Sequence, residues 1–288
     1  MRYYRTAVEG RLHLVALENG TAYDLTSARP AVTDFADLAH VADVADESVD
    51  DIARGLVDEA DVVDVPDEDG VAVPVAADEV WAAGVTYEIS EQAREAESGM
   101  PEMYLQVYDA DRPEIFFKAT QSRVVGPGEA VGIRRDSEWN VPEPELGIVL
   151  HRGDIVGYTI GNDMSSRSIE GENPLYLPQA KVYDRSCSLG PCVVSAESID
   201  DPHDLTMSMT ISDGDEIRYE GETSTGEMVR TCEELVSYLT RHNAVPESTV
   251  LLTGTSLVPD EGFTLSEDDE IDITIDGIGR LMNPATMV

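Results

Sequence analysis

Three acidic residues in one short stretch have the spacing expected of a metal site. Glu143 and Glu145 lie one residue apart at the start of an apolar run, and a second apolar run ends at Asp163. Successive side chains of a strand point to opposite faces, so Glu143 and Glu145 are predicted to share one face. The HRGD turn at residues 151–154 lets the second strand fold back against the first. Asp163 is therefore predicted to lie beside the two glutamates.

Three carboxylates at one place repel one another and are costly to bury without a partner. A hard divalent cation such as Mg²⁺ removes that cost, because it prefers oxygen ligands and keeps waters that a substrate can replace. A second reading stays open at this point, since the chain is very acidic and the three residues could be ordinary surface acids. The spacing alone favours neither reading.

Several separate blocks of the chain resemble the fumarylacetoacetate hydrolase superfamily. The E-x-E pair is followed by GYTIGND and AKVYDRSCSLGP, with RPEIFFKA before them and TGTSLVP and IDGIGRLMNP after them. These blocks keep the family's order from Trp81 to the C-terminus. The resemblance implies that Glu143, Glu145 and Asp163 bind Mg²⁺, or Mn²⁺ or Ca²⁺. It also implies that the Lys of the A-K-x-x-D block, which is Lys181, is catalytic.

One block departs from the superfamily hydrolases, which carry a water-activating His in an N-Y-x-x-H pattern. When Tyr87 is aligned with that Tyr, Ser90 stands at the His position, and the chain has no His between His40 and His151. The GVTYE block around Tyr87 is instead similar to a branch that dehydrates 2-keto-3-deoxy sugar acids. On this resemblance Tyr87, Ser90 and Thr255, the last from the family's G-T block, hold the polar end of the substrate.

Glu114 and Lys181 are the candidates for acid/base chemistry. Glu114 opens the apolar run that leads to Lys118, and the dehydratase resemblance supports a catalytic group there rather than one more surface acid. Lys181 is one of very few lysines in the chain. Its retention favours an acid/base group, or a clamp on an anionic substrate, over a salt bridge to Asp184. Which of the two takes a proton and which gives one stays open.

The resemblance implies a lyase that dehydrates a 2-keto-3-deoxy-pentonate, derived from xylonate or arabinonate, to 2-oxoglutarate semialdehyde (2,5-dioxopentanoate) in pentose degradation. Metal chelation would make the C3 protons of such a substrate acidic, so that one group takes a C3 proton while another protonates the departing C4 hydroxyl. The alternatives within the superfamily are an acylpyruvate hydrolase and an oxaloacetate-type decarboxylase. A metal-dependent binding protein is a third possibility, but it has no need of Lys181 beside the metal.

The charge balance limits the partners and the setting of the protein. The 288 residues include 58 acidic and 19 basic side chains, for a net charge of −39. Such a chain repels nucleic acid, whose recognition needs basic patches. Acids spread along a chain with 42% hydrophobic residues indicate a folded protein with the acidic surface of a halophile. The scarcity of Lys favours a halophilic archaeon over an acidic mesophile.

The same sequence favours a cytoplasmic protein, because no apolar leader and no membrane-length apolar run is present. We expect a homo-oligomer, either a dimer or a tetramer. The three cysteines are odd in number and lack C-x-x-C spacing, so they are predicted to be free and buried.

The resemblance implies a mostly β (α+β) fold, with a fumarylacetoacetate-hydrolase-like rolled mixed sheet at residues 76–288. Residues 1–75 are predicted to form a small N-terminal α/β domain, whose role is packing or subunit contact. Hairpin turns are predicted at residues 9–10 and 19–20, and one or two helices within residues 31–56.

In the larger domain a helix is predicted from Ser90 to Met100. A second helix follows the capping-box pair Thr231 and Glu234. Its predicted buried stripe consists of Cys232, Leu235, Val236 and Leu239. Residues 168–191 are predicted to be a long loop, because they contain several Gly and Pro residues.

Overall fold

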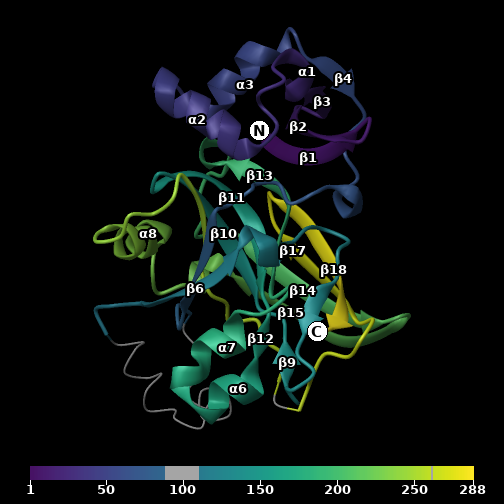
Figure 1. Cartoon of the computed structure of the whole chain (residues 1–288), viewed down its shortest axis with the longest axis vertical. Coiled ribbons are helices and arrows are strands. Elements are labelled where there is room, and N and C mark those ends of the chain that lie inside the picture. Colours follow the sequence, from purple (N-terminus) through teal and green to yellow (C-terminus); the bar gives the residue numbers. More distant parts are fainter. Residues whose placement is uncertain (88–109, 261) are drawn as a thin grey trace.

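A computed structural model describes residues 1–87, 110–260 and 262–288. Strands predominate among these residues, as predicted, and they form a long mixed sheet, a five-stranded sheet and a two-stranded ribbon. Ser90 and the helix predicted from Ser90 to Met100 lie outside the described residues. Figure 1 shows the long sheet running through the molecule, with the N-terminal helices at one end.

The long sheet is mixed, because most neighbouring strands are antiparallel while two pairs among the described strands are parallel. The parallel pairs are β16 (Ser248–Leu252) with β5 (Glu79–Gly84), and β13 (Cys187–Ser195) with β7 (Val124–Val125). Its path begins at the N-terminal strands and ends at the strand that carries Glu114. In spatial order the strands are β4 (Asp61–Val63), β3 (Thr21–Asp24), β2 (Arg11–Glu18), β1 (Arg2–Val8), β13 (Cys187–Ser195), β11 (Asp154–Asp163), β10 (Pro144–His151), β16 (Ser248–Leu252), β5 (Glu79–Gly84) and β6 (Glu114–Thr120), with β7 (Val124–Val125) beside β13.

The N-terminal segment folds as the sequence predicts in its local elements. Two-residue turns at residues 9–10 and 19–20 join β1, β2 and β3, with positive φ at all four positions. Two helices, α2 (Phe35–Ala45) and α3 (Val49–Val57), follow the short α1 (Leu25–Ala28). However, β1 pairs with β13 through Arg2 and Val194, so these strands continue the main sheet. A separate domain ending at residue 75 stays a prediction.

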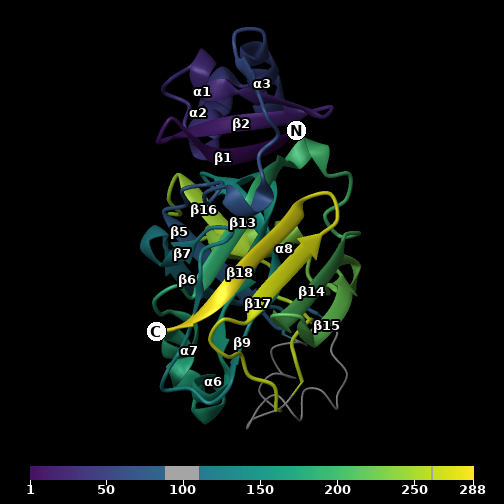
Figure 2. The ribbon, with the colours of Figure 1, turned by 90° about the vertical axis from the view of Figure 1, so that its right-hand side faces the viewer.

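The second sheet covers one face of the long sheet and closes the main core. Ile148 and Ile160 of the long sheet share one apolar cluster with Met209, Ile273 and Leu281 of the second. Figure 2 shows β17 (Glu270–Ile275) and β18 (Gly279–Met287) crossing in front of β13. The second sheet consists of β15 (Glu216–Ser224), β14 (Thr206–Asp213), β17 (Glu270–Ile275), β18 (Gly279–Met287) and β8 (Val131–Ile133).

Helix α8 (Cys232–Thr240) packs against the same core with the buried stripe predicted for it. Its N-cap is Thr231, whose side chain accepts a hydrogen bond from the Glu234 N–H, as the capping pattern indicates. All three cysteines are free and buried, which confirms their predicted packing role. Four short 3₁₀ turns complete the main body at Glu68–Gly70, Gln121–Arg123, Ala196–Ser198 and Thr225–Glu227.

The prediction of a long loop at residues 168–191 is wrong up to Lys181 and again from Cys187, where β13 begins. Helix α6 (Arg167–Glu172), a 3₁₀ turn (Pro174–Tyr176) and helix α7 (Leu177–Lys181) lie in the first part, next to the ribbon of β9 (Asn140–Val141) and β12 (Ser165–Ser166). Ser166 caps α6. Pro174 and Pro178 stand in the first turns of the segments that follow, where a missing N–H costs nothing. The prolines therefore start helical turns here instead of marking a loop.

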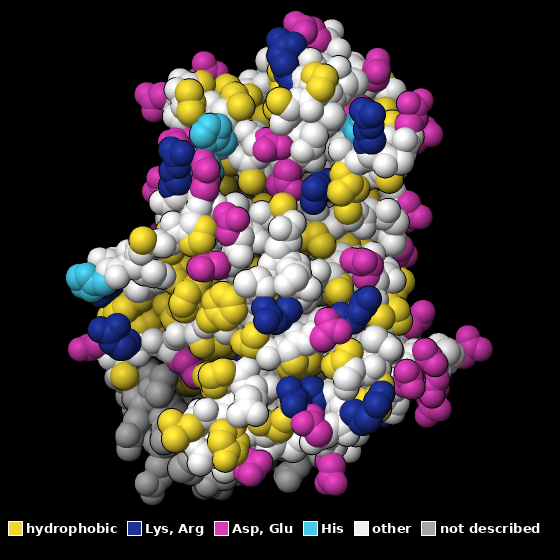
Figure 3. All heavy atoms as spheres, viewed as in Figure 1, with side chains coloured by type: hydrophobic (Ala, Val, Ile, Leu, Met, Phe, Trp, Pro, Cys, Tyr) yellow, Lys and Arg dark blue, Asp and Glu magenta, His cyan; other side chains and the backbone are white. Residues whose placement is uncertain are grey.

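Acidic side chains are spread over both the N-terminal segment and the main body in Figure 3, in line with the net charge of −39. We expect the folded state to weaken when salt is lowered, because unscreened repulsion between like charges then returns. Circular-dichroism melts in molar and in millimolar KCl test this expectation. An unchanged melting temperature would contradict the halophile interpretation. In the part of the chain that the structure describes, no helix is long and apolar enough to span a bilayer.

Candidate active site

The strand pair β10–β11 brings together the three carboxylates predicted from the sequence. The strands are antiparallel, Glu145 lies opposite Gly161, and the Asp163 N–H donates to the Glu143 carbonyl at 2.9 Å. One carboxylate oxygen of each acid lies within 4.8 Å of the others, and all three residues are buried. The predicted juxtaposition is therefore present, whereas a metal-binding role for the three residues is a prediction.

Lys181 points its ammonium group into this cluster from the end of α7. Its Nζ donates to Glu143 Oε2 at 2.6 Å, to Asp163 Oδ2 at 3.2 Å and to Ser165 Oγ at 2.6 Å. These three bonds use all the N–H groups of an ammonium ion. No ion pair with Asp184, the alternative partner, is found within the described residues.

Sequence reasoning missed Lys118 as a component of the site. It is fully buried on β6, and its Nζ pairs with Asp163 Oδ1 and donates to the carbonyls of Met164 and Lys181. The register between β5 and β6 shifts here, leaving Lys118 as the extra residue of a β-bulge, a feature that re-aims side chains. Lys118 and Lys181 are the only lysines in the sequence. That scarcity was the signal that could have identified Lys118.

Glu143 and Glu145 differ in their electrostatic surroundings, although they are one residue apart. Burial alone would raise the pKa of Glu143, but Lys181 and Arg167 lower it to about 2. Burial raises the pKa of Glu145 well above its usual value, and the neighbouring carboxylates of Asp163 and Glu143 raise it further. Glu143 is therefore a carboxylate paired with cations, whereas Glu145 is a buried carboxyl group for which no ion pair is found among the described residues.

The surroundings of Glu145 show that the cluster fits a hard divalent cation. Its Oε2 accepts a hydrogen bond from the Gly254 N–H at 2.7 Å, and no ion pair to it is found in the described part of the chain. Gly254 has a φ of +81°, and a Cβ there would meet the Thr86 side chain, so glycine is required for this approach. Three buried carboxylates, one of them lacking a cation, form the all-oxygen donor set that Mg²⁺ prefers.

Glu114, the first residue of β6, has an environment suited to proton transfer. Its carboxyl group lies against Gly84 on β5, where any Cβ would collide with it. Burial raises the pKa of Glu114 to about 7, and the charge of Glu170 adds to the increase, while Lys181 opposes it. A carboxyl group with this pKa exists in both protonation states near neutral pH.

The raised pKa of Glu114 predicts how the free energy of unfolding depends on pH. A carboxyl group whose pKa is raised on folding stabilises the protein below its unfolded value of 4.5 and loses that contribution as pH rises through about 7. We expect Glu114→Gln to remove the loss, so that the variant gains about 2 kcal/mol relative to wild type between pH 5 and pH 8.5, after allowance for solvent screening. Urea unfolding at constant KCl measures this gain.

The control for this measurement is Glu216→Gln, at an exposed position on β15. It should follow the wild-type dependence of unfolding free energy on pH. Equal pH dependence in Glu114→Gln and wild type would contradict the raised pKa of Glu114.

The structure describes two of the three predicted substrate-binding residues, Tyr87 and Thr255. Tyr87 is buried, and its hydroxyl has no hydrogen-bond partner within the described residues. Burial raises its pKa, with Glu145 as the next cause, so the phenol stays protonated. Thr255 is half-buried, and its hydroxyl accepts from the Leu257 N–H at 3.0 Å. Ser90 lies outside the described residues. The loop of Gly254 joins Thr255 to the Glu145 side of the cluster.

The chain matches the family model "Fumarylacetoacetate (FAA) hydrolase C-terminal" over residues 79–286. It is 64% identical over 289 residues to a probable 2-keto-3-deoxyxylonate dehydratase of Haloferax volcanii, covering 100% of both chains. It is 44% identical over 220 residues to 2-dehydro-3-deoxy-D-arabinonate dehydratase of Saccharolobus solfataricus, covering 74% of each.

A solved structure extends the likeness to the whole fold. The 2-keto-3-deoxy-D-arabinonate dehydratase complexed with magnesium and 2,5-dioxopentanoate aligns with a TM-score of 0.84 and 36% identity, covering 100% of this chain and 99% of that one. The resemblance found in the sequence motifs is confirmed by these similarities.

Proposed function

The chain belongs to the fumarylacetoacetate hydrolase family, and from this premise we propose that it dehydrates a 2-keto-3-deoxy-pentonate to 2,5-dioxopentanoate. The observation that carries the proposal is the 64% identity, over the full length of both chains, to the Haloferax volcanii protein named for that dehydration. The site agrees with a lyase, because none of the five histidines belongs to the carboxylate cluster. A C–C hydrolase of this superfamily would need such a base to activate water.

The proposed cofactor is Mg²⁺, held by Glu143, Glu145 and Asp163. When bound, the ion would withdraw electrons from the 2-oxo group of the substrate and so acidify the C3 protons. Lys118 fixes the position of Asp163 through a buried ion pair, and the Gly254 N–H fixes that of Glu145. Lys181 and Arg167 hold Glu143 in the same way, so partners that are not themselves metal ligands hold all three carboxylates in place.

The first half of the reaction breaks one C3–H bond and the C4–O bond, and it forms a C3=C4 double bond and water. We assign removal of the C3 proton to Glu114, because its pKa of about 7 leaves a large carboxylate fraction at neutral pH. We assign protonation of the departing C4 hydroxyl to Lys181, which is a donor in all three of its hydrogen bonds.

The second half of the reaction is the isomerisation of the enone that the first half produces. A proton leaves C5, another reaches C3, and the enol at C4–C5 then becomes the aldehyde of 2,5-dioxopentanoate. No further reactant is consumed, so the overall change is the loss of one water. A group that both accepts and returns protons near neutral pH can serve both halves, and Glu114 has that property.

The polar end of the substrate requires partners beyond the cluster. We propose Tyr87, Thr255 and Ser90 for this role. The buried Tyr87 hydroxyl, which has no hydrogen-bond partner among the described residues, supports it. The substrate is a small sugar acid. A cytoplasmic location and assembly into a dimer or tetramer stay predictions.

One assay tests the proposal. A 2-keto-3-deoxy-pentonate keeps a single stereocentre, C4, so the two enantiomers form a complete substrate set. Each is incubated with the protein, Mg²⁺ and molar KCl, and 2,5-dioxopentanoate is measured, with an acylpyruvate and oxaloacetate in parallel. We expect dehydration of one enantiomer in preference to the other. Cleavage of the acylpyruvate or decarboxylation of oxaloacetate, with both pentonates unchanged, would overturn the lyase proposal.

A further inference from the structure

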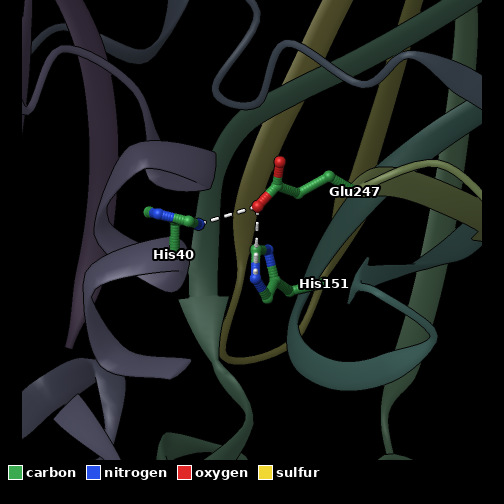
Figure 4. Close-up of side chains that lie close together, drawn as sticks. All are labelled: His40, His151 and Glu247. Atoms are coloured by element: carbon green, nitrogen blue, oxygen red, sulfur yellow. Dashed lines mark hydrogen bonds and ion pairs between the residues drawn. The ribbon is translucent and has the colours of Figure 1, made fainter. Parts of the chain in front are cut away.

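A second group of possible metal ligands lies far along β10 from the carboxylate cluster. His40 comes from α2, His151 from the last position of β10, and Glu247 from the residue before β16. One ligand atom of each lies within 4.8 Å of the others. Figure 4 shows both imidazole rings directed toward the Glu247 carboxylate. Three segments distant in sequence therefore place two nitrogen donors and one oxygen donor together.

His40 forms a hydrogen bond within this group, but His151 does not. His40 Nδ1 lies 2.7 Å from Glu247 Oε1, but His151 Nε2 lies 3.8 Å from that oxygen and 3.5 Å from Asp43 Oδ2. The His151 side chain is only 5% exposed. Neither of its ring nitrogens has a hydrogen-bond partner within the described residues. Buried polar atoms are almost always satisfied, so these nitrogens require an explanation.

We propose that His40, His151 and Glu247 form a site for Zn²⁺ or a similar transition-metal ion. Imidazole nitrogen suits such ions, and two histidines with one carboxylate are a known ligand set for zinc. The chemistry differs from that of the carboxylate cluster, whose all-oxygen donors suit Mg²⁺. A metal ion here would give the His151 ring nitrogen a partner in place of the hydrogen bond that the described residues do not provide.

The position of this site gives the ion a structural role. Helix α2 belongs to the N-terminal segment, whereas β10 and β16 are neighbouring strands inside the main sheet. An ion bound to His40 and to His151 would therefore tie the N-terminal helices to the centre of the long sheet. Metal binding of this kind contributes directly to folding free energy, because the site does not exist in the unfolded chain.

Arg152 is the cation that now neutralises the acids beside the histidines. Its guanidinium lies 2.9 Å from Glu247 Oε1 and 2.8 Å from Asp43 Oδ2, and its side chain is 53% exposed. A metal ion on Glu247 Oε1 would compete with this pair, and the exposed arginine is free to move into solvent. The proposal therefore predicts opposite effects for removing a ligand and for removing Arg152.

The test measures Zn²⁺ affinity of the full chain by competition with a chromophoric chelator, in molar KCl with excess Mg²⁺ to fill the carboxylate cluster. Wild type is expected to bind one Zn²⁺, and His40→Ala and His151→Ala to bind it about a hundredfold more weakly. Arg152→Gln is expected to bind about tenfold more tightly, through loss of the competing cation. His242→Ala, at an exposed position outside the group, is the matched control and should equal wild type.

A thermal measurement separates lost binding from lost folding. Zn²⁺ is expected to raise the melting temperature of wild type by about 5 °C. His40→Ala should melt near wild type without Zn²⁺, since the His40 side chain is 49% exposed, and should show no shift with it. Equal Zn²⁺ affinity in His40→Ala, His151→Ala and His242→Ala would overturn the proposal. So would loss of the bound Zn²⁺ in Glu145→Gln, which would place the ion at the carboxylate cluster.

Discussion

Glu145→Gln is expected to lower Mg²⁺-dependent dehydration at least about a thousandfold, the scale of losing several kcal/mol of metal-ion stabilisation. The substitution removes one of three carboxylate ligands while keeping the size of the side chain. It should not reduce the free energy of unfolding, because no ion pair to Glu145 is found within the described residues and burial already raises its pKa. Steady-state kinetics and urea unfolding measure the dehydration rate and the free energy of unfolding, and calorimetric titration measures the Mg²⁺ affinity, which should fall.

Glu143→Gln and Asp163→Asn serve as the contrasting variants. They should also abolish turnover, but each removes a partner of a buried lysine, Lys181 for Glu143 and both lysines for Asp163. Asp163→Asn leaves Lys118 without an ion pair among the described residues, which costs about 3 to 5 kcal/mol of stability. Glu143→Gln should cost less, because Lys181 keeps its ion pair with Asp163. If Glu145→Gln retained wild-type Mg²⁺ affinity and turnover, the three carboxylates would not be the metal site. If it were as unstable as Asp163→Asn, Glu145 would have a structural partner.

The strand-turn-strand unit at the centre of the site was predictable because its information is local. The side-chain period of a strand places Glu143 and Glu145 on one face. The two-residue turn at residues 152–153, with positive φ at both positions, sets the register that returns Asp163 to them. The hairpins of the N-terminal segment and the capped helix α8 were predictable for the same reason.

Features that depend on distant segments were not predictable from local patterns. The pairing of β1 with β13 joins Arg2 to Val194, which are far apart in the sequence, and nothing in either strand specifies its partner. The burial of Lys118 depends on a β-bulge and on carbonyl groups supplied by residues 164 and 181. The helices α6 and α7 are hidden by composition, because Gly and Pro are typical of loops, although Pro174 and Pro178 stand where prolines begin helical turns.

The two proposed proton-transfer groups can be tested by substitutions that leave all three carboxylates in the chain. Glu114→Gln and Lys181→Ala are each expected to lower the dehydration rate at least about a hundredfold, the usual scale for losing an acid or base. Glu114→Gln should leave Mg²⁺ affinity largely unchanged, because the residue is not one of the three carboxylates. Lys181 donates to Glu143 and Asp163, so an unchanged Mg²⁺ affinity in Lys181→Ala would show that these bonds do not organise the metal ligands.

Two further measurements distinguish the roles of Glu114 and Lys181. If Glu114 removes the C3 proton, Glu114→Gln should stop the exchange of C3 hydrogen with deuterated water, whereas Lys181→Ala should slow exchange less than dehydration. Lys181→Arg keeps the positive charge beside Glu143 and Asp163 but cannot release a proton near neutral pH. An inactive Lys181→Arg variant with normal Mg²⁺ affinity supports proton donation by Lys181. Recovery of wild-type turnover in this variant would show instead that Lys181 acts through its charge alone, and C4 protonation would then belong to another group.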